Sequence, residues 1–236
     1  MSKPHTVWKV MPHGPLERLG YNLYSVTGTM KMPLGTFTRR MTVVKLKGDR
    51  LAIYSAIALA EPTMKELEAL GTPAFLIVPS AIHRLDVAPW KLRYPKMLVV
   101  APEGAREEVN KVLRIEATLA MLGDPRVSLE AVPGTERREL SMVVETETGK
   151  TLVVNDLIFN FPKMKGLAGI GLRLLGFGPG HPTIPKLVKK KLVANDGEMR
   201  AQLRAWADLA GLERILVAHG PPINNARETL LELAAA

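Results

Sequence analysis

The chain has 236 residues, of which 47% are hydrophobic, 23% are charged and none is cysteine. This composition is typical of a globular protein with a substantial core, and it excludes a disulfide framework, a thiolate metal site and a cysteine nucleophile. The formal net charge of +9 favours acidic ligands. Aromatic residues make up only 5% and no nucleic-acid-binding motif is present, so we expect no nucleic-acid partner.

Domain number and compartment follow from the same sequence. The length and the lack of internal repeats fit one large domain, preceded by a partly irregular segment at residues 1–20. The N-terminal residues lack the apolar stretch of a secretory signal, and no apolar run approaches the roughly 20 residues that span a bilayer. Together with the lack of cysteine, these features predict a soluble, cytoplasmic protein.

After the irregular N-terminal segment, residues 21–59 have the alternating pattern of β-strands. Within them, LKGDRL is typical of a hairpin with Gly48-Asp49 in the turn. A helical period follows at residues 62–70, with proline near its start and glycine just past its end. Residues 104–122 are also predicted to form a helix, because their apolar side chains share one face. Between these helices, apolar strands are expected at residues 75–78 and 97–102.

The second half continues the alternation of strands and helices. Three strands are expected between residues 127 and 159, with Thr148-Gly149-Lys150 as a hairpin turn. Residues 196–210 form an expected helix that Asp196 would cap. RILVAHGPP is a final buried strand that ends in a polar turn, and a closing helix follows. The basic run Lys186–Lys191 is interpreted as a solvated helix face or loop flank.

Residues 161–185 interrupt this alternation. The segment is rich in glycine, proline and leucine and has few acids. It could be a lid over a pocket, a surface for an apolar partner, or an interfacial contact with a membrane. The alternative is a loop with a short helix that packs on the core.

Potential ligands follow three apolar strands, in FLIVPSAIHRLD, TLVVNDLIFN and RILVAHGPP. The carboxyl end of a strand is where α/β proteins usually place their chemistry. Imidazole and carboxylate groups suit zinc, iron or manganese. The other interpretation is that these groups cap or stabilise turns. The potential ligands are His83, Asp86, Asp156 and His219, whereas His5, His13 and His181 show no pattern of partners.

In these stretches the sequence resembles the metallo-β-lactamase superfamily. VPSAIHRLD stands at the family's His-x-His-x-Asp-His loop, VPGTE at its Pro-Gly-His-Thr turn, VVNDLIF at its Gly-Asp strand end and VAHGPP at its Gly-His-Gly turn. The resemblance covers residues 21–236 as one domain, with the Gly/Pro-rich insertion at 161–185. It implies an α/β fold, a four-layer αββα sandwich of two mixed sheets flanked by helices.

The metal motif is eroded relative to that family. The first loop keeps one histidine where the family has three, and the second reads Pro133-Gly134-Thr135 without the histidine. A full dinuclear site is therefore not expected. Two alternatives remain: one zinc, iron or manganese ion held by His83, His219 and the carboxylate of Asp86 or Asp156, or no metal at all.

These alternatives predict two functions. The first is a hydrolase of ester or amide-type bonds in a small molecule, with a metal-activated water as nucleophile, Asp156 or Asp86 as ligand or base, and His219 as ligand. The second is a non-catalytic, metal-free protein that uses the degenerate metal-site cleft to bind a small molecule or a partner. The net charge favours an acidic one. A serine nucleophile, Ser55 or Ser80, is a minor option because neither lies in a Gly-x-Ser-x-Gly turn.

Overall fold

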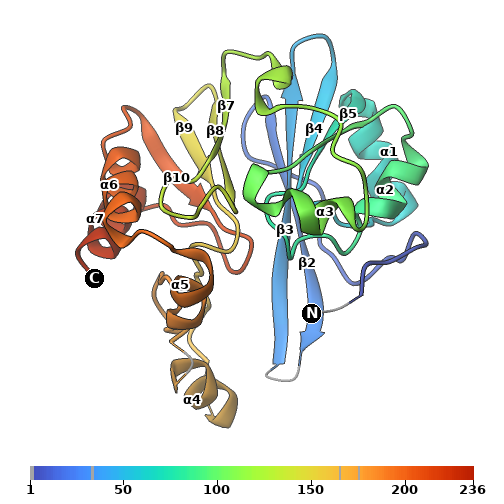
Figure 1. Cartoon of the computed structure of the whole chain (residues 1–236). Helices are drawn as coiled ribbons and strands as arrows, with labels where there is room; N and C mark the ends of the chain where they lie inside the picture. Colours follow the sequence, from blue (N-terminus) through green and yellow to red (C-terminus); the bar gives the residue numbers. More distant parts are fainter. Residues whose placement is uncertain (1–2, 33–34, 165, 175) are drawn as a thin grey trace.

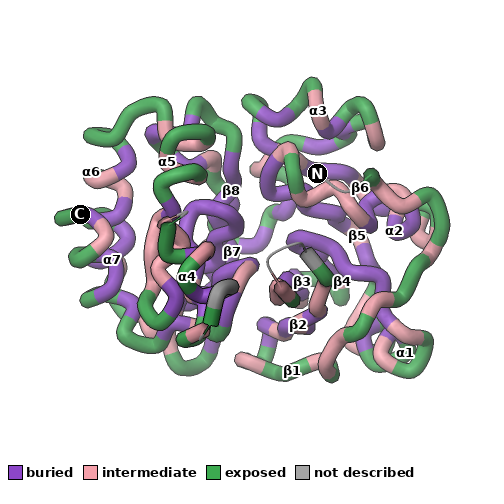
Figure 2. The backbone as a smooth tube through the Cα atoms, turned by 90° about the horizontal axis from the view of Figure 1, so that it is seen from below, coloured by how far each residue is buried: buried purple, intermediate pink, exposed green. Residues whose placement is uncertain are grey.

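A computed structural model describes residues 3–32, 35–164, 166–174 and 176–236. Within these residues, a six-stranded and a four-stranded sheet face each other at the centre of the molecule, and helices cover their outer faces (Figure 1). The strands are mostly buried, whereas exposed residues concentrate on the helices and loops (Figure 2). The four-layer αββα sandwich predicted from the sequence is confirmed.

The six-stranded sheet has the order β1-β2-β3-β4-β5-β6. Strands β1 to β4 pair antiparallel, and β4, β5 and β6 pair parallel. The predicted hairpin at Gly48-Asp49 is confirmed, since both residues have the positive φ, 72° and 53°, that a tight turn of this kind requires. The bounds are Glu17–Arg18 (β1), Leu23–Met32 (β2), Gly35–Leu46 (β3), Arg50–Tyr54 (β4), Thr72–Ile77 (β5) and Leu98–Val100 (β6).

The four-stranded sheet has the order β10-β9-β8-β7. The hairpin predicted at Thr148-Gly149-Lys150 joins β8 to β9, which pair antiparallel. Strand β10 comes from much later in the chain and pairs parallel with β9, so the ends of these two strands lie side by side. The bounds are Val127–Ala131 (β7), Leu140–Glu145 (β8), Lys150–Val153 (β9) and Leu212–Leu216 (β10).

Helices cover the two outer faces. The six-stranded sheet carries Glu61–Leu70 (α1), Val87–Arg93 (α2) and Arg106–Asn110 (α3), and the four-stranded sheet carries Asp196–Ala207 (α6) and Ala226–Ala235 (α7) (Figure 1). Helix α6 is capped by the side chain of Asn195, which accepts the Glu198 N–H at 3.2 Å, so the predicted cap was one residue too late. Within the described ranges, every helix is too short or too polar to cross a bilayer.

Three apolar layers hold the sandwich together. The middle layer lies between the sheets and contains Tyr54 and Ile77 from one and Met142 and Leu216 from the other. The outer layers pack helices on sheets, with Met64 of α1 and Trp90 of α2 on one side and Leu203 of α6 and Leu230 of α7 on the other. Burial of these side chains stabilises the fold by roughly 1.5–3 kcal/mol each.

The single helix predicted at residues 104–122 is wrong. A short 3-10 turn at Glu103–Ala105 leads into α3, the chain then runs without helix to residue 118, and a second 3-10 turn follows at Leu119–Leu122. Ile115 is buried under the outer layer and Ala117 between the sheets. Both sides of this stretch are therefore buried, and the Glu116 and Ala117 N–H groups both donate to Val99 O. An extended path satisfies these contacts, and a helix would not.

The N-terminal segment crosses the six-stranded half of the molecule. Trp8 packs on Trp90 with ring centroids 5.4 Å apart and donates to Leu59 O at 2.9 Å. His13 Nε2 accepts the Ala60 N–H at 2.9 Å. The interpretation of His13 as a residue without a pattern of partners is wrong, because its partner lies 47 residues away in the sequence. The segment is therefore attached to the core, although most of it is neither helix nor strand.

Candidate metal-binding site

Three loops meet where the two sheets come together. His83 lies in the turn after β5, Asp156 in the turn after β9, and His219 in the turn after β10. A β-bridge between Ser80 and Glu139 links the first loop to the four-stranded half. Because β9 and β10 are parallel neighbours, Asp156 and His219 leave the same edge of that sheet.

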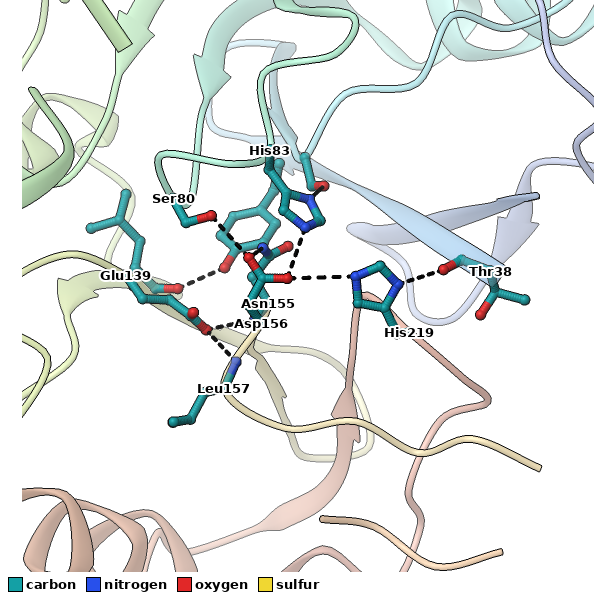
Figure 3. Close-up of polar contacts among 11 residues, drawn as sticks. Thr38, Ser80, His83, Glu139, Asn155, Asp156, Leu157 and His219 are labelled. Atoms are coloured by element: carbon teal, nitrogen blue, oxygen red, sulfur yellow. Dashed lines mark hydrogen bonds and ion pairs between the residues drawn. The ribbon is translucent and has the colours of Figure 1, made fainter. Parts of the chain in front are cut away.

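The side chains of these loops converge on the Asp156 carboxylate. His83 Nε2 lies 3.0 Å and His219 Nε2 3.5 Å from the same oxygen, Oδ1 (Figure 3). Among the described residues, these three form a group whose potential ligand atoms all lie within 4.8 Å of one another. The His83 and His219 imidazoles are only 13% and 14% exposed. The group is therefore mostly buried, but part of each ring is accessible to water.

Each imidazole is oriented through its second nitrogen. His219 Nδ1 lies 2.6 Å from Thr38 O (Figure 3). His83 Nδ1 lies 2.9 Å from Ser55 Oγ. Ser55 directly follows β4 and has the left-handed φ of 57°, an uncommon conformation for a residue other than glycine. Such backbone strain is often found at functional sites. Both serines considered as nucleophiles therefore lie at the group, Ser55 on His83 and Ser80 on Asp156.

The second carboxylate oxygen of Asp156 is also occupied. Ser80 Oγ and Asn155 Nδ2 each donate to Oδ2 at 3.0 Å. Burial alone would raise the pKa of Asp156, but the facing imidazoles and their hydrogen bonds hold this pKa well below its ordinary value. Asp156 is therefore largely buried, with polar partners on both carboxylate oxygens.

Glu139 fixes the loop that carries Asp156. Its Oε1 accepts the N–H groups of Asn155 at 3.1 Å and Leu157 at 3.0 Å (Figure 3). Burial, and then the nearby charge of Asp156, raise the pKa of Glu139 well above its ordinary value. The sequence analysis did not single out Glu139, and its position just after the VPGTE turn was the only signal for it.

The turn that carries His219 is fixed from the other side. Buried Arg40 donates to Val217 O at 3.1 Å and to Gly220 O at 3.0 Å. Gly220 has a φ of 125°, and a Cβ there would lie 1.9 Å from Asn160 O. Glycine is therefore required directly after His219.

Asp86 lies apart from this group. Its side chain is fully buried, with Arg39 Nη2 at 2.6 Å and His5 Nδ1 at 2.7 Å. Asp86 precedes α2, but its carboxylate contacts these two side chains and makes no capping hydrogen bond to the helix N-terminus. The group of potential ligands in the described chain includes His83, Asp156 and His219 and leaves Asp86 out. The sequence also gave His5 no partner, and this contact corrects that interpretation.

Comparisons with known proteins identify the fold. No protein-family model and no curated protein sequence matches the chain. In contrast, the mono-zinc form of the metallo-β-lactamase FIM-1 from Pseudomonas aeruginosa matches 96% of this chain and 96% of its own, at 14% identity and a TM-score of 0.62. The chain has the metallo-β-lactamase fold.

Other solved structures agree. The metallo-β-lactamase from Erythrobacter litoralis matches 93% of this chain and 95% of its own, at 12% identity and a TM-score of 0.61. That from Hirschia baltica matches 94% and 98%, at 14% identity and a TM-score of 0.59. At these identities the similarity establishes the metallo-β-lactamase fold, and the chemistry must be argued from the residues of this chain.

The donor atoms of the site fit one divalent cation. A carbonyl oxygen only accepts, so His219 Nδ1 donates to Thr38 O, and a neutral His219 presents the lone pair of Nε2 to Asp156. Two acceptors then face each other at 3.5 Å. Either a cation between them or a proton on the imidazole resolves this arrangement. A metal-binding histidine usually donates its other N–H to a carbonyl, as His219 does here.

The second loop of the metallo-β-lactamase motif contributes no ligand in this chain. Thr135 stands in the VPGTE turn and is fully buried, and its hydroxyl donates to Val132 O at 2.7 Å. Gly134 O accepts the N–H groups of Ala194 and Asn195, which attaches the turn to the start of α6. These hydrogen bonds make the turn part of the framework.

Two cavities flank the group. The smaller, of about 200 Å³, is lined by Arg39, Ser55, His83 and Arg84. The larger, of about 570 Å³, is mostly apolar and lies beside helices α4, Gly166–Leu174, and α5, Lys186–Leu192. Asp156 and His219 line both cavities, so a small molecule could reach the group from either side.

Proposed function

We propose that this protein hydrolyses ester or amide-type bonds with one divalent metal ion held by His83, Asp156 and His219. The observation that carries the proposal is the convergence of two imidazole nitrogens and one carboxylate oxygen within 4.8 Å at the meeting point of two cavities. Two histidines with one carboxylate leave coordination positions for water or substrate. Zinc, iron and manganese all suit this donor set.

When bound, such a cation polarises a carbonyl and lowers the pKa of a coordinated water. The chain's own residues would orient the ligands. Thr38 and Ser55 set the direction of the imidazoles, and Ser80 and Asn155 hold the carboxylate. The proposal gives Asp86 no ligand role, because Arg39 and His5 already occupy its carboxylate.

The first experiment is elemental analysis of the protein purified without chelator or affinity tag. We expect about one zinc, iron or manganese per chain, and hydrolysis of simple esters that a chelator abolishes. His83→Ala, Asp156→Ala and His219→Ala should each lower the metal content. Full hydrolysis by a metal-free preparation would contradict the proposal and direct attention to Ser55, whose hydroxyl contacts His83.

A second candidate function is metal-free binding of a small molecule, with an acidic one favoured by the net charge of +9. One observation supports it: Asp156 already has two imidazoles on Oδ1 and two donors on Oδ2, so a protonated His219 would satisfy the group without a cation. The two candidates differ in response to chelator. A metal site loses thermal stability on chelation, because the metal binds the folded state, whereas the metal-free site does not.

Contact with a membrane surface through residues 161–185 stays a prediction. Supporting it, Ile170 and Leu174 of α4 are 53% and 83% exposed, and Leu187 of the neighbouring basic helix α5 is 43% exposed. Co-sedimentation with anionic liposomes would test it. We expect the intact protein to pellet and Leu174→Glu to remain in the supernatant. Leu231→Glu, on α7 at the far side of the four-stranded half, is the control.

A further inference from the structure

The larger cavity differs from the smaller one in chemistry as well as size. Its volume, about 570 Å³, lies within the range of about 300–1,000 Å³ common for small-molecule sites. Apolar side chains from distant parts of the sequence make up most of its wall: Phe37, Phe159, Leu172, Phe177, Val188 and Leu192. Arg138 and Lys191 also line it, whereas the smaller cavity has Arg39, His83 and Arg84 within a much smaller volume. The molecule therefore offers a larger, mostly apolar space on one side of the same carboxylate and a smaller, more polar space on the other.

The apolar wall is joined directly to the metal-binding group. The Phe159 ring stacks on the His219 imidazole, with centroids 4.8 Å apart and planes 15° from parallel. Phe177 packs edge-on against Phe159 at 5.2 Å. The apolar part of a ligand in the cavity would therefore lie against the Phe159 ring that covers His219. The polar end of the same ligand would lie near Asp156.

The cavity is formed by the segment that sequence analysis could not assign. Leu172 of α4 is fully buried, and α4 is the helix within residues 161–185. Phe161 packs on Phe37 of β3 at 5.2 Å, which fastens the segment to the β2–β3 hairpin. Helix α5 completes the wall with Val188 and Leu192. The insertion thus has a defined apolar inner face over the site.

We propose that this cavity binds a hydrocarbon chain, and that the substrates are esters or amides of medium-chain aliphatic acids. The cleavage step rests on the proposed function. Water adds to the acyl carbonyl, the bond from that carbon to oxygen or nitrogen breaks, and a carboxylate, a proton and an alcohol or amine leave. No oxidant or reductant is needed. The hydrocarbon chain occupies the apolar wall, and the carbonyl lies beside Asp156 and His219.

Two measurements test this inference separately from the hydrolysis. The first is calorimetric binding of the alcohols from 1-butanol to 1-octanol, which carry no bond to cleave. Affinity should rise roughly fourfold per added methylene. The second is kcat/KM for p-nitrophenyl esters from acetate to decanoate, which should rise with chain length until the cavity is full.

A matched pair of variants locates the effect. Leu192→Trp fills the cavity from α5, and Leu231→Trp places the same ring on α7, far from it. We expect Leu192→Trp to weaken 1-octanol binding at least tenfold and to lower the octanoate-to-acetate ratio of kcat/KM by a similar factor. Leu231→Trp should retain the chain-length dependence of the unmodified protein.

The possible failures are distinguishable. If 1-octanol binds and Leu192→Trp weakens it, but no ester is cleaved, the hydrocarbon site stands and the proposed hydrolysis is wrong. If esters are cleaved without dependence on chain length and the alcohols do not bind to the unmodified protein, the hydrolysis stands and the hydrocarbon site is wrong. The binding series needs no variant, so misfolding of Leu192→Trp cannot obscure the result.

Discussion

Two buried aspartates of similar sequence context have different surroundings in this protein. Asp156 faces two imidazoles, and it lines two cavities. Asp86 is fully buried, and its carboxylate is in contact with the Arg39 guanidinium and the His5 imidazole. Under the proposed function we therefore expect Asp156, which lines both cavities, to act in the chemistry, and Asp86, whose carboxylate is fully buried and already paired, to act in the structure.

The largest expected effect is the loss of hydrolytic activity when Asp156 or His219 is replaced. Asp156→Ala or His219→Ala should lower kcat/KM on a cleaved ester by on the order of 1,000-fold, because a bound metal supplies several kcal/mol of transition-state stabilisation. Metal content should fall with it. Asp86→Asn should keep its metal when it is folded. Loss of metal from Asp86→Asn alone, with Asp156→Ala unaffected, would reverse the assignment.

Asp86 should dominate stability instead. Asp86→Ala leaves the Arg39 guanidinium buried without its partner, and we expect the free energy of unfolding to fall by about 3–5 kcal/mol. Urea denaturation followed by circular dichroism measures the change. The double variant Asp86→Leu with Arg39→Met should recover part of the loss, because it removes both charges. A fall below 1 kcal/mol in Asp86→Ala would show that this pair is not a structural one.

A smaller effect is expected from the residues that orient the imidazoles. Ser55→Ala removes the contact to His83 Nδ1, and this should weaken metal affinity by about 10- to 100-fold. His5→Ala removes the corresponding contact at Asp86 and should leave metal affinity unchanged. Competition with a chromophoric chelator gives both affinities. Equal losses in the two variants would mean that the two aspartates form one coupled site.

The smallest effect is expected at a third buried aspartate, Asp124, which is also paired with an arginine. Asp124 is paired with Arg126 at 2.7 Å, remote from the site, and the hydrogen bonds of Arg126 hold the pKa of Asp124 well below its ordinary value. A lowered pKa contributes stability that is complete above the unfolded value of about 3.9 and is lost as pH falls toward the folded one. Asp124→Asn should therefore lower stability at pH 6 and flatten its decline below pH 4. Denaturation at several pH values tests this, and an unchanged slope would contradict it.

Sequence analysis succeeded where local pattern was sufficient. The hairpins at Gly48-Asp49 and at residues 148–150 depend on a few neighbouring residues, and both were predicted. The order of three strand ends identified His83, Asp86, Asp156 and His219 as potential ligands, of which the structure brings together all but Asp86, and the resemblance predicted the sandwich. The helix expected at residues 104–122 failed, because a helical period of apolar residues could not show that two different layers bury Ile115 and Ala117.

The sequence by itself determined the layered fold, the candidate ligands and the absence of cysteine chemistry. Only the tertiary structure decided which ligands meet, because the deciding contacts are long-range: His219 and Thr38 are 181 residues apart, and His5 and Asp86 are 81 apart. The same holds for the apolar cavity, whose wall joins β3 to α4 and α5. Hydrophobic pattern records whether a residue is buried, but the partner of a buried charge is fixed only when distant segments pack together.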